Sequence, residues 1–313
     1  MMIESDVPRS RFQGSLVGLA IGDALGMPFE GLRASTIREK LGRVPDFLDA
    51  PWRMLKAGQW TDDTKMMIYQ ARSIIESGGV DAHDTARKFV EWLQSNDWRG
   101  IGRATYASLK RLQAGTDPDE SGEEGEMAAG NGVAMRIAPV ALVGCMSLDK
   151  LREDVRSVGL ITHNNSEAIA GGRAVAFAVA GGARGDLEPA SLISEAIEFI
   201  GPSLVAERLA QASRFLDSGM EAGEATARLG TGGYVVETVA SAFFCFLNTP
   251  GDFEASVSQA VAGGLDADTT AAVVGAISGA YNGLDAIPER WRRQVENYGG
   301  IIKLADGIFE LAF

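Results

Sequence analysis

Two acidic turns, far apart in the chain, carry the side chains best suited to chemistry. The first is Thr61-Asp62-Asp63-Thr64, ahead of an apolar run, and the second is Asp266-Ala267-Asp268-Thr269, ahead of another helix-like run. Neighbouring residues on a helix point about 100° apart, so adjacent oxygen-bearing side chains suit a turn that leads into a helix. Adjacent carboxylates repel each other unless a cation or a proton lies between them. Two such turns at two helix starts can converge on one divalent-metal site.

The ligand types indicate which ion such a site would hold. Carboxylate and hydroxyl oxygens, with no matching Cys or His cluster, favour Mg²⁺, Mn²⁺ or Ca²⁺ over zinc. An EF-hand is excluded at the second turn, because the sixth loop position is Ala271 and not Gly, and the twelfth is Ile277 and not Glu. Two metal ions about 3.5–4 Å apart could share the site, clamp vicinal hydroxyls of a substrate and activate a water.

Three other segments could bind the remainder of a ligand. Gly100-Ile101-Gly102 opens a predicted helix, whose free N–H groups and dipole favour a phosphate. Gly130-Asn131-Gly132 predicts a turn that either presents backbone donors to a ligand or only starts the next helix. His163 has polar neighbours ahead of a further helix, which fits either a capping histidine or a ligand contact.

Two further acids lie near the start of the chain. Asp23 interrupts a run with glycine at positions 14, 18, 22 and 26, a spacing that puts the glycines on one side of a helix, where another helix can approach closely. Asp23 is therefore either a buried capping or packing acid or part of a functional site. Glu30 follows an apolar Met27-Pro28-Phe29 segment and is a second candidate.

The composition limits the class of protein. The chain has 313 residues with a net charge of −13, which argues against binding to a nucleic-acid backbone and suits divalent cations. Cys145 and Cys245 each lie in an apolar run, so we expect two small buried hydrophobes in a reducing compartment and no disulfide framework. The acidic start lacks signal-peptide features and no apolar stretch reaches spanning length, so we expect a cytoplasmic protein with no membrane contact.

The sequence predicts that helices position all of these candidate site residues. Residues 33–57 look irregular because Pro45 and Pro51 break any long helix, and 115–130 forms an acidic loop. No alternating apolar pattern makes a convincing sheet. An all-α single domain over residues 1–313 is predicted, with helices at 14–26, 64–77, 82–94, 103–112, 167–180, 190–200, 205–216, 220–229, 234–247, 253–262, 270–281, 289–297 and 301–313.

Five segments together resemble the ADP-ribosylglycohydrolase family, in the same order, over about residues 12–285. These are Gly22-Asp23-Ala24-Leu25-Gly26, Thr61-Asp62-Asp63-Thr64, Gly130-Asn131-Gly132-Val133-Ala134-Met135-Arg136, Thr162-His163 and Asp266-Ala267-Asp268-Thr269. The resemblance implies an all-α orthogonal helical bundle around a dinuclear Mg²⁺ or Mn²⁺ centre. It also implies hydrolysis of the bond between ADP-ribose and its acceptor, which reverses ADP-ribosylation.

The resemblance also implies roles for individual residues. Asp63 or Glu30 would assist proton movement. Tyr234 would stack on the adenine, unless it is a core aromatic, and His163 would contact the distal ribose. The implied metal ligands are Thr61, Asp62, Asp63, Asp266, Asp268 and Thr269. The implied substrate contacts are Asp23, Gly100, Ile101, Gly102, Gly130, Asn131, Gly132, Met135, His163 and Tyr234. The partners would be an ADP-ribosylated protein or another ADP-ribose conjugate, with ADP-ribose as product.

Two departures from the family pattern concern the acceptor and the second acidic turn. Members that release ADP-ribose from arginine commonly carry an acid beside the phosphate-binding glycines, where this chain has Arg99. The acceptor therefore stays open between arginine, serine and other groups. Leu265 replaces a glycine before the second acidic turn, a minor change because no ligand depends on that side chain. The alternatives to an enzyme are a non-catalytic ADP-ribose-binding or crystallin-like structural relative, and a Ca²⁺-stabilised helical protein.

Overall fold

The computed structural model describes residues 9–41 and 46–313, which form helices almost throughout. The predicted all-α fold class is confirmed. The helices are α1 (Arg9–Gly26), α2 (Ala34–Leu41), α3 (Asp62–Ser77), α4 (Ala82–Gln94), α5 (Arg103–Gln113), α6 (Ala138–Val143), α7 (Leu148–Leu160), α8 (Ser166–Arg184), α9 (Leu192–Ile200), α10 (Leu204–Asp217), α11 (Ala222–Leu229), α12 (Val235–Asn248), α13 (Phe253–Gly263), α14 (Ala267–Asn282), α15 (Glu289–Gln294) and α16 (Tyr298–Ala312).

Side chains at the helix starts help to fix where several helices begin. Asp81 accepts a hydrogen bond from Asp84 N, and Asp252 accepts one from Ala255 N, at the N-termini of α4 and α13. Asn165 accepts from two backbone N–H groups at the start of α8. Each bond satisfies a donor that has no partner within its own helix.

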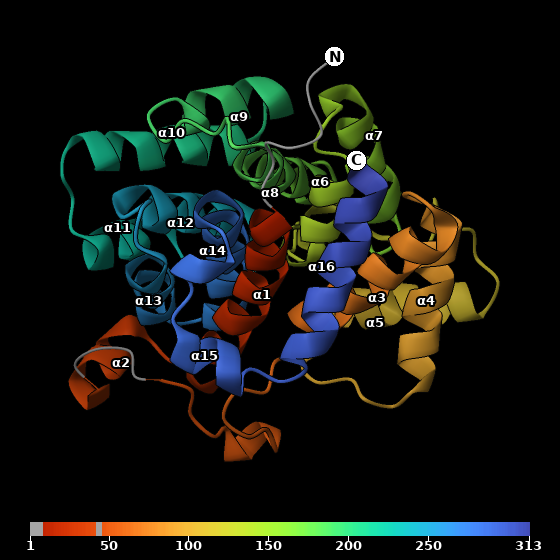
Figure 1. The fold of residues 1–313 in the computed structure, drawn as a ribbon, viewed down its shortest axis with the longest axis horizontal. Coiled ribbons are helices and arrows are strands. Elements are labelled where there is room, and N and C mark those ends of the chain that lie inside the picture. Colours follow the sequence, from red (N-terminus) through yellow and green to blue (C-terminus); the bar gives the residue numbers. More distant parts are fainter. Residues whose placement is uncertain (1–8, 42–45) are drawn as a thin grey trace.

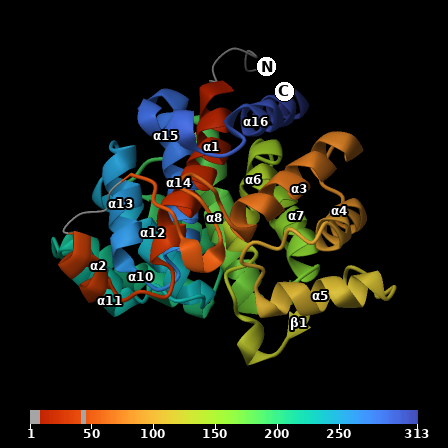
Figure 2. The ribbon, with the colours of Figure 1, turned by 90° about the horizontal axis from the view of Figure 1, so that it is seen from below.

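Helices α1 and α14 lie side by side at the centre of the molecule (Figures 1 and 2). A methyl group added at Gly18 would collide with the carbonyl oxygen of Gly275, and one added at Gly275 would collide with that of Gly18. Gly14 and Gly279 oppose each other in the same way, so the two helices run antiparallel. The predicted glycine strip thus brings the end of α1 next to the start of α14, where the second acidic turn lies.

The other helices flank this central pair. In both views, α10, α11 and α13 lie on one side, and α3, α4 and α5 lie on the other (Figures 1 and 2). Nearly all buried apolar side chains form one contiguous cluster that runs from Phe12 to Ile308. Cys145 and Cys245 are buried and free within it, as predicted. No described helix combines the length and apolarity that a membrane span requires.

Four parts of the secondary structure differ from the sequence prediction. The short helix α6 was not predicted, although most of its residues are buried and apolar. Helix α2 lies within the segment predicted to be irregular. Pro45 and Pro51 do not prevent this helix, because both come after its last residue, Leu41. Helix α7 was missed, although Leu151, Val155 and Val158 are buried at helical spacing, because charged residues dominate the remainder of it. The described chain also contains one very short parallel strand pair, β1 (Glu123–Glu124) with β2 (His163–Asn164).

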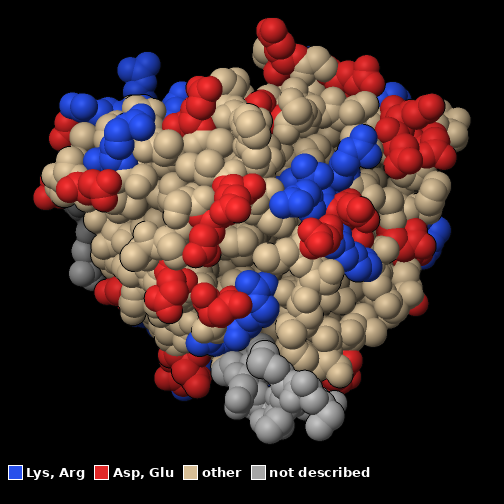
Figure 3. Space-filling view, turned by 90° about the horizontal axis from the view of Figure 1, so that it is seen from above, with Lys and Arg blue, Asp and Glu red and all other residues tan. Residues whose placement is uncertain are grey.

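Charges of both signs are mixed on the surface. Figure 3 shows Lys and Arg side chains lying among Asp and Glu on one face of the molecule. The net charge of −13 is therefore not gathered into a continuous acidic patch on that face.

Candidate active site

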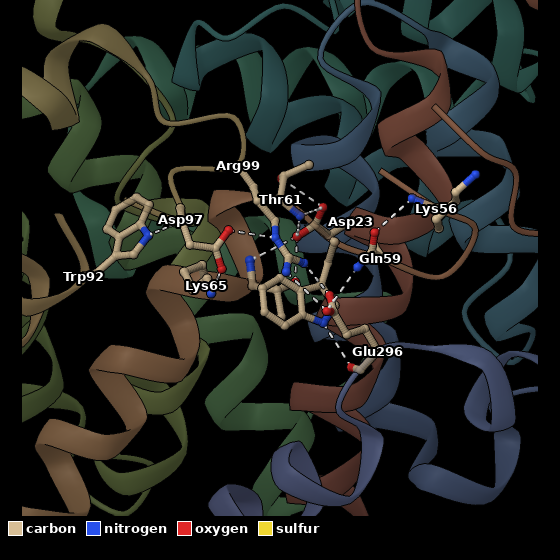
Figure 4. A network of polar contacts seen from close by, with 11 residues as sticks. Asp23, Lys56, Gln59, Thr61, Lys65, Trp92, Asp97, Arg99 and Glu296 are labelled. Atoms are coloured by element: carbon tan, nitrogen blue, oxygen red, sulfur yellow. Dashed lines mark hydrogen bonds and ion pairs between the residues drawn. The ribbon is translucent and has the colours of Figure 1, made fainter. Parts of the chain in front are cut away.

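The first acidic turn is held in place by Asp23, a buried residue of α1. Its carboxylate accepts hydrogen bonds from the backbone N–H of Thr61 (2.9 Å) and of Thr64 (3.0 Å). It also lies within hydrogen-bond distance of both threonine hydroxyls, at 2.9 Å from Thr61 Oγ1 and 2.6 Å from Thr64 Oγ1. Asp23 thus satisfies the free donors at the start of α3 from a neighbouring helix, and Figure 4 shows its contact with Thr61.

This position corrects the prediction that Asp23 contacts substrate. Asp23 is fully buried and is not among the residues that line the cavity described below. The capping alternative, which the sequence left open, describes its contacts better. Asp23 nevertheless belongs to the acidic cluster itself.

Acidic side chains from α1, from the start of α3, from the start of α14 and from the segment after α1 meet in two overlapping groups. One oxygen each of Asp23, Asp63 and Asp268 lie within 4.8 Å of one another, and the same holds for Glu30, Asp266 and Asp268. Asp268 belongs to both groups. The two acidic turns therefore converge, as their positions at helix starts predicted.

Burial and mutual repulsion raise the pKa values of these carboxyls. Burial, followed by Asp268 and Asp23, raises the pKa of Asp62 to about 8. Burial and Asp268 raise the pKa of Asp266 to about 7, and burial and the neighbouring acids raise that of Asp63 well above its usual range. A divalent cation among these oxygens would supply the opposite charge that favours their ionised forms.

The residues fit a hard divalent cation. The buried Asp63 Oδ1 has no hydrogen-bond partner in the described part of the chain, so it retains a free coordination site. Asp63 is grouped with the carboxylates of Asp23 and Asp268, and such oxygen ligands suit Mg²⁺ or Mn²⁺. Of the predicted ligands, Asp62, Asp63, Asp266, Asp268 and Thr269 line the cavity, whereas Thr61 lies buried behind it. Asp23 is an additional acid that was not predicted as a ligand.

The cavity beside these acids has a volume of about 230 Å³. Most of the predicted ligand-binding residues line it. The predicted residues in the lining are Glu30, Gly100, Gly102, Gly130, Asn131, Gly132, Met135 and His163. Four further lining residues were not predicted, namely Arg103, Ala104, Thr105 and Gly233. Ile101 was predicted to bind substrate but is not part of the lining, because it is half-buried against the main hydrophobic cluster.

Asn131 connects the glycine turn to the second acidic turn. Its backbone N–H donates to Gly233 O (3.1 Å), and its side-chain Nδ2 donates to Thr238 Oγ1 (3.0 Å) and to Asp266 Oδ2. These bonds orient the Asp266 carboxylate. The sequence offered no indication of this link, because the two turns lie far apart in the chain.

His163 is a buried neutral imidazole whose Nδ1 lies within hydrogen-bond distance of Thr162. Burial, and then Arg136, lower the pKa of His163 to about 3. Arg136 Nη2 donates to Thr162 Oγ1 (2.9 Å), and the same hydroxyl lies 2.8 Å from His163 Nδ1. Because Thr162 Oγ1 accepts from Arg136, it can donate its own proton to Nδ1, which leaves the ring hydrogen on Nε2.

The His163 ring lies against the glycine turn. A methyl group at Gly132 would lie 2.5 Å from His163 Cε1, and one at Gly130 would lie 3.1 Å from Nε2. Both glycines are therefore needed for the ring and the turn to approach each other so closely. This contact places His163 Nε2 at the wall of the cavity.

Arg53 is a residue of the site that sequence reasoning missed. It ends the short 3₁₀-helix η2 (Pro51–Arg53) and forms an ion pair with Glu30. Burial raises the pKa of Asp268, whereas the charge of Arg53 acts in the opposite direction. A methyl group at Gly100 would lie 2.7 Å from Asp62 Oδ1 and 2.9 Å from Arg53 Nη1, so Gly100 allows the two side chains to lie close to this loop.

Arg99, the residue that departs from the family pattern, does not line the cavity. Its Nε donates to Asp97 Oδ1 (2.9 Å), and its Nη1 pairs with Glu296 (Figure 4). Its guanidinium lies 4.9 Å from the centre of the Trp60 ring. Asp97 in turn binds Lys65 at 2.5 Å. The charges of Arg99 and Asp97 are thus both neutralised by neighbours outside the cavity.

Tyr234 lines a second hollow, of about 710 Å³, beside the first. The two share Gly130 and Gly233 in their walls. Tyr234 is 37% exposed, so it is not a core aromatic. The neighbouring side chains of Leu204 (49%) and Met127 (85%) are exposed as well. The hollow offers an apolar surface large enough for a planar ring.

Comparison with known proteins identifies the family. The family described as ADP-ribosylglycohydrolase matches residues 4–313. The chain belongs to the ADP-ribosylglycohydrolase family. An uncharacterized protein of Archaeoglobus fulgidus is 35% identical over 96% of each chain. The ADP-ribosyl-[dinitrogen reductase] glycohydrolase of Rhodospirillum rubrum is 30% identical and is matched over 91% of this chain and 90% of its own.

A solved structure has the same fold as this chain. The structure, an ADP-ribosylglycohydrolase-related protein complex, superposes with a TM-score of 0.83 at 31% identity and covers 97% of this chain and 99% of its own. The resemblance stated from five sequence segments is thereby confirmed for the family and for the fold.

Proposed function

We propose that this protein hydrolyses the glycosidic bond between the distal ribose of ADP-ribose and an acceptor group, and so reverses ADP-ribosylation. The observation that carries the proposal is the meeting of two acidic turns and two glycine turns around one cavity. Membership of a hydrolase family supports it. The R. rubrum relative is named for ADP-ribosyl-dinitrogen reductase, so an ADP-ribosylated protein is one candidate substrate.

Two divalent cations, Mg²⁺ or Mn²⁺, would be held by Asp63, Asp266 and Asp268 with the neighbouring acids and threonines. When bound, they would supply positive charge to orient vicinal hydroxyls and to lower the pKa of a water. The unpartnered Asp63 Oδ1 supports this assignment.

The chain's own residues would bind and orient the substrate. Backbone N–H groups at Gly100 and Gly102, at the start of α5, would receive the diphosphate together with Arg103. His163 Nε2–H would donate to a ribose hydroxyl. Tyr234 would contact the adenine in the second hollow. Asp63 or Glu30 would accept the proton of the attacking water, because both carboxylates line the cavity.

An assay with ADP-ribosyl-arginine and ADP-ribosyl-serine, with Mg²⁺, with Mn²⁺ and with a chelator, tests the proposal. We expect ADP-ribose to be released from at least one conjugate, and we expect chelator or the Asp266→Asn substitution to abolish the release. Release that neither treatment affects would overturn the metal-dependent mechanism. Tight binding of ADP-ribose without turnover of any conjugate would instead indicate the non-catalytic, ADP-ribose-binding alternative.

A further inference from the structure

A short closed loop holds Arg53 against the segment that carries Glu30. Ala50 N donates to Leu55 O (2.9 Å) and Leu55 N donates to Ala50 O (3.2 Å), so the chain between them is closed at its base. Ala50 and Leu55 pack with the first residue of the 3₁₀-helix η1 (Met27–Phe29) in a small apolar cluster apart from the main one. Glu30 directly follows η1. The base of the loop is therefore fixed to the segment of Glu30.

The loop directs Arg53 toward the acids and its two neighbours toward solvent. The side chains of Trp52 and Met54 are exposed. The Arg53 side chain is only 23% exposed and forms the ion pair with Glu30. Glu30 lines the acidic cavity, whereas Arg53 does not. Arg53 therefore acts on the cavity through the acid that it contacts.

The segment of Glu30 is also joined to the second acidic turn. Gly31 N donates to Leu265 O (2.7 Å), and Leu265 N donates to Leu32 O (2.7 Å). Leu265 directly precedes Asp266. These backbone bonds keep Glu30 near Asp266 without any contribution from the Arg53 side chain.

The two acidic groups differ in the charges around them. Arg53 contacts Glu30, which forms one group with Asp266 and Asp268. Burial raises the pKa of both Asp266 and Asp268, and the charge of Arg53 acts in the opposite direction on each. In the other group, the charges that act most strongly on Asp63 are all those of neighbouring acids. A positive charge is thus already in place at the Glu30 group.

A divalent cation in the Glu30 group would share the Glu30 carboxylate with a guanidinium. Like charges repel each other more strongly within a protein than in water, because the surroundings screen them less. The charge-assisted contact with Arg53 must also weaken before both oxygens of Glu30 can become ligands. Neither effect arises at Asp63, whose Oδ1 has no hydrogen-bond partner in the described part of the chain.

We propose that Arg53 makes the two metal positions unequal, so that an ion at Asp63 binds first and an ion at Glu30 binds second and more weakly. The inference rests on the proposed function for the presence of two ions. Arg53 is then a positioning residue that sets the metal concentration at which the second ion is acquired. That ion lies beside Glu30, a candidate acceptor of the proton from water, so Arg53 would make hydrolysis depend on the metal supply.

Titration of the metal-free full chain with Mn²⁺ tests this, followed by calorimetry and by electron paramagnetic resonance. We expect two classes of site whose affinities differ by about tenfold or more. Arg53→Gln should tighten the weaker class by about tenfold and leave the tighter class within about twofold, because it removes one positive charge beside Glu30. The resonance signal of two coupled Mn²⁺ ions should therefore appear at a lower Mn²⁺ concentration in this variant.

Three further variants check the assignment. Glu30→Gln should remove the weaker class and keep the tighter one. Arg53→Lys, which retains the charge, should stay close to the unmodified protein. Arg72→Gln is the matched control and should change neither class, because Arg72 is an exposed arginine on α3 that does not line the cavity.

Equal affinities of the two classes in the unmodified protein would overturn the inference. An Arg53→Gln variant whose weaker class is unchanged, or weaker still, would overturn it as well. Circular dichroism shows whether each metal-free variant is folded, and Arg53→Met, which keeps an aliphatic side chain, tests the same expectation if Arg53→Gln is not. A folded protein that binds no Mn²⁺ would instead contradict the metal centre of the proposed function, so the two failures are distinct.

Discussion

The carboxylate of Asp23 accepts hydrogen bonds from both the backbone N–H and the hydroxyl of Thr64, at 3.0 and 2.6 Å. One acid on α1 thereby holds the first turn of α3, which carries Asp62 and Asp63. The position of the acidic turn relative to the central helix pair therefore depends on a side chain that does not itself line the cavity.

Asp23→Asn should destabilise the fold. Four donors from Thr61 and Thr64 surround the Asp23 carboxylate, and the substitution replaces one of its two acceptor oxygens with an amide nitrogen that cannot accept. We expect the free energy of unfolding to fall by about 1–3 kcal/mol in urea titration. Asp217→Asn, at an exposed position near the end of α10, should change it by less than about 0.5 kcal/mol. Equal effects of the two substitutions would show that the bonds of Asp23 do not stabilise α3.

The metal-free protein should become less stable as the pH rises from 6 to 9. The folded-state pKa values of Asp23, Asp62 and Asp266 lie at about 7, 8 and 7, above the value of 3.8 for a free side chain. The folded state therefore binds more protons than the unfolded state between these limits. The stabilisation is complete below about pH 4 and is lost as the pH rises through 7 to 8.

Melting temperatures measured across this range, in chelator and in Mg²⁺, check the prediction. The loss should be much smaller with Mg²⁺, because the cation takes over the role of the protons. Identical pH profiles in chelator and in Mg²⁺ would show that the cluster does not bind the ion.

Thr162→Val should remove the preference of His163 for one tautomer. The chain has two histidines, so ¹⁵N spectra with His83→Gln assign the His163 signals directly. We expect an unprotonated Nδ1 and a protonated Nε2 from pH 8 to pH 5, since the pKa of His163 is lowered to about 3. Thr162→Val should give a mixture of tautomers and Thr162→Ser should restore one. A protonated Nδ1 in the unmodified protein would contradict the bonding scheme.

Gly132→Ala should weaken ADP-ribose binding more than it changes the fold. The added methyl would lie 2.5 Å from His163 Cε1, so the ring must move out of its position at the cavity wall. We expect about a two- to tenfold loss of affinity by calorimetry, comparable to the loss of one hydrogen bond to a neutral ribose hydroxyl. Gly251→Ala, where a methyl would meet no atom within 4 Å, should leave the affinity unchanged.

The sequence predicted those features that local patterns determine. Glycines four residues apart indicated a close helix contact, and acids at two helix starts indicated their convergence. The partners of individual side chains depended instead on segments distant in the chain. Arg53 lay in a segment that looked irregular, and nothing near it indicated an ion pair with Glu30. Asn131 similarly reaches Asp266 across 135 positions. Tyr234 was also left undecided between core and ligand, because exposure at a helix start cannot be read from its neighbours.

The antiparallel contact of α1 with α14 has a consequence for the order of assembly. The first acid of the site to be synthesised is Asp23, and the last is Asp268, 245 positions later. During translation, the acids of the first half lack their counterpart until nearly the whole chain has left the ribosome. An ion that needs acids from both turns would therefore bind only after both halves of the polypeptide have docked, and its binding would mark that step.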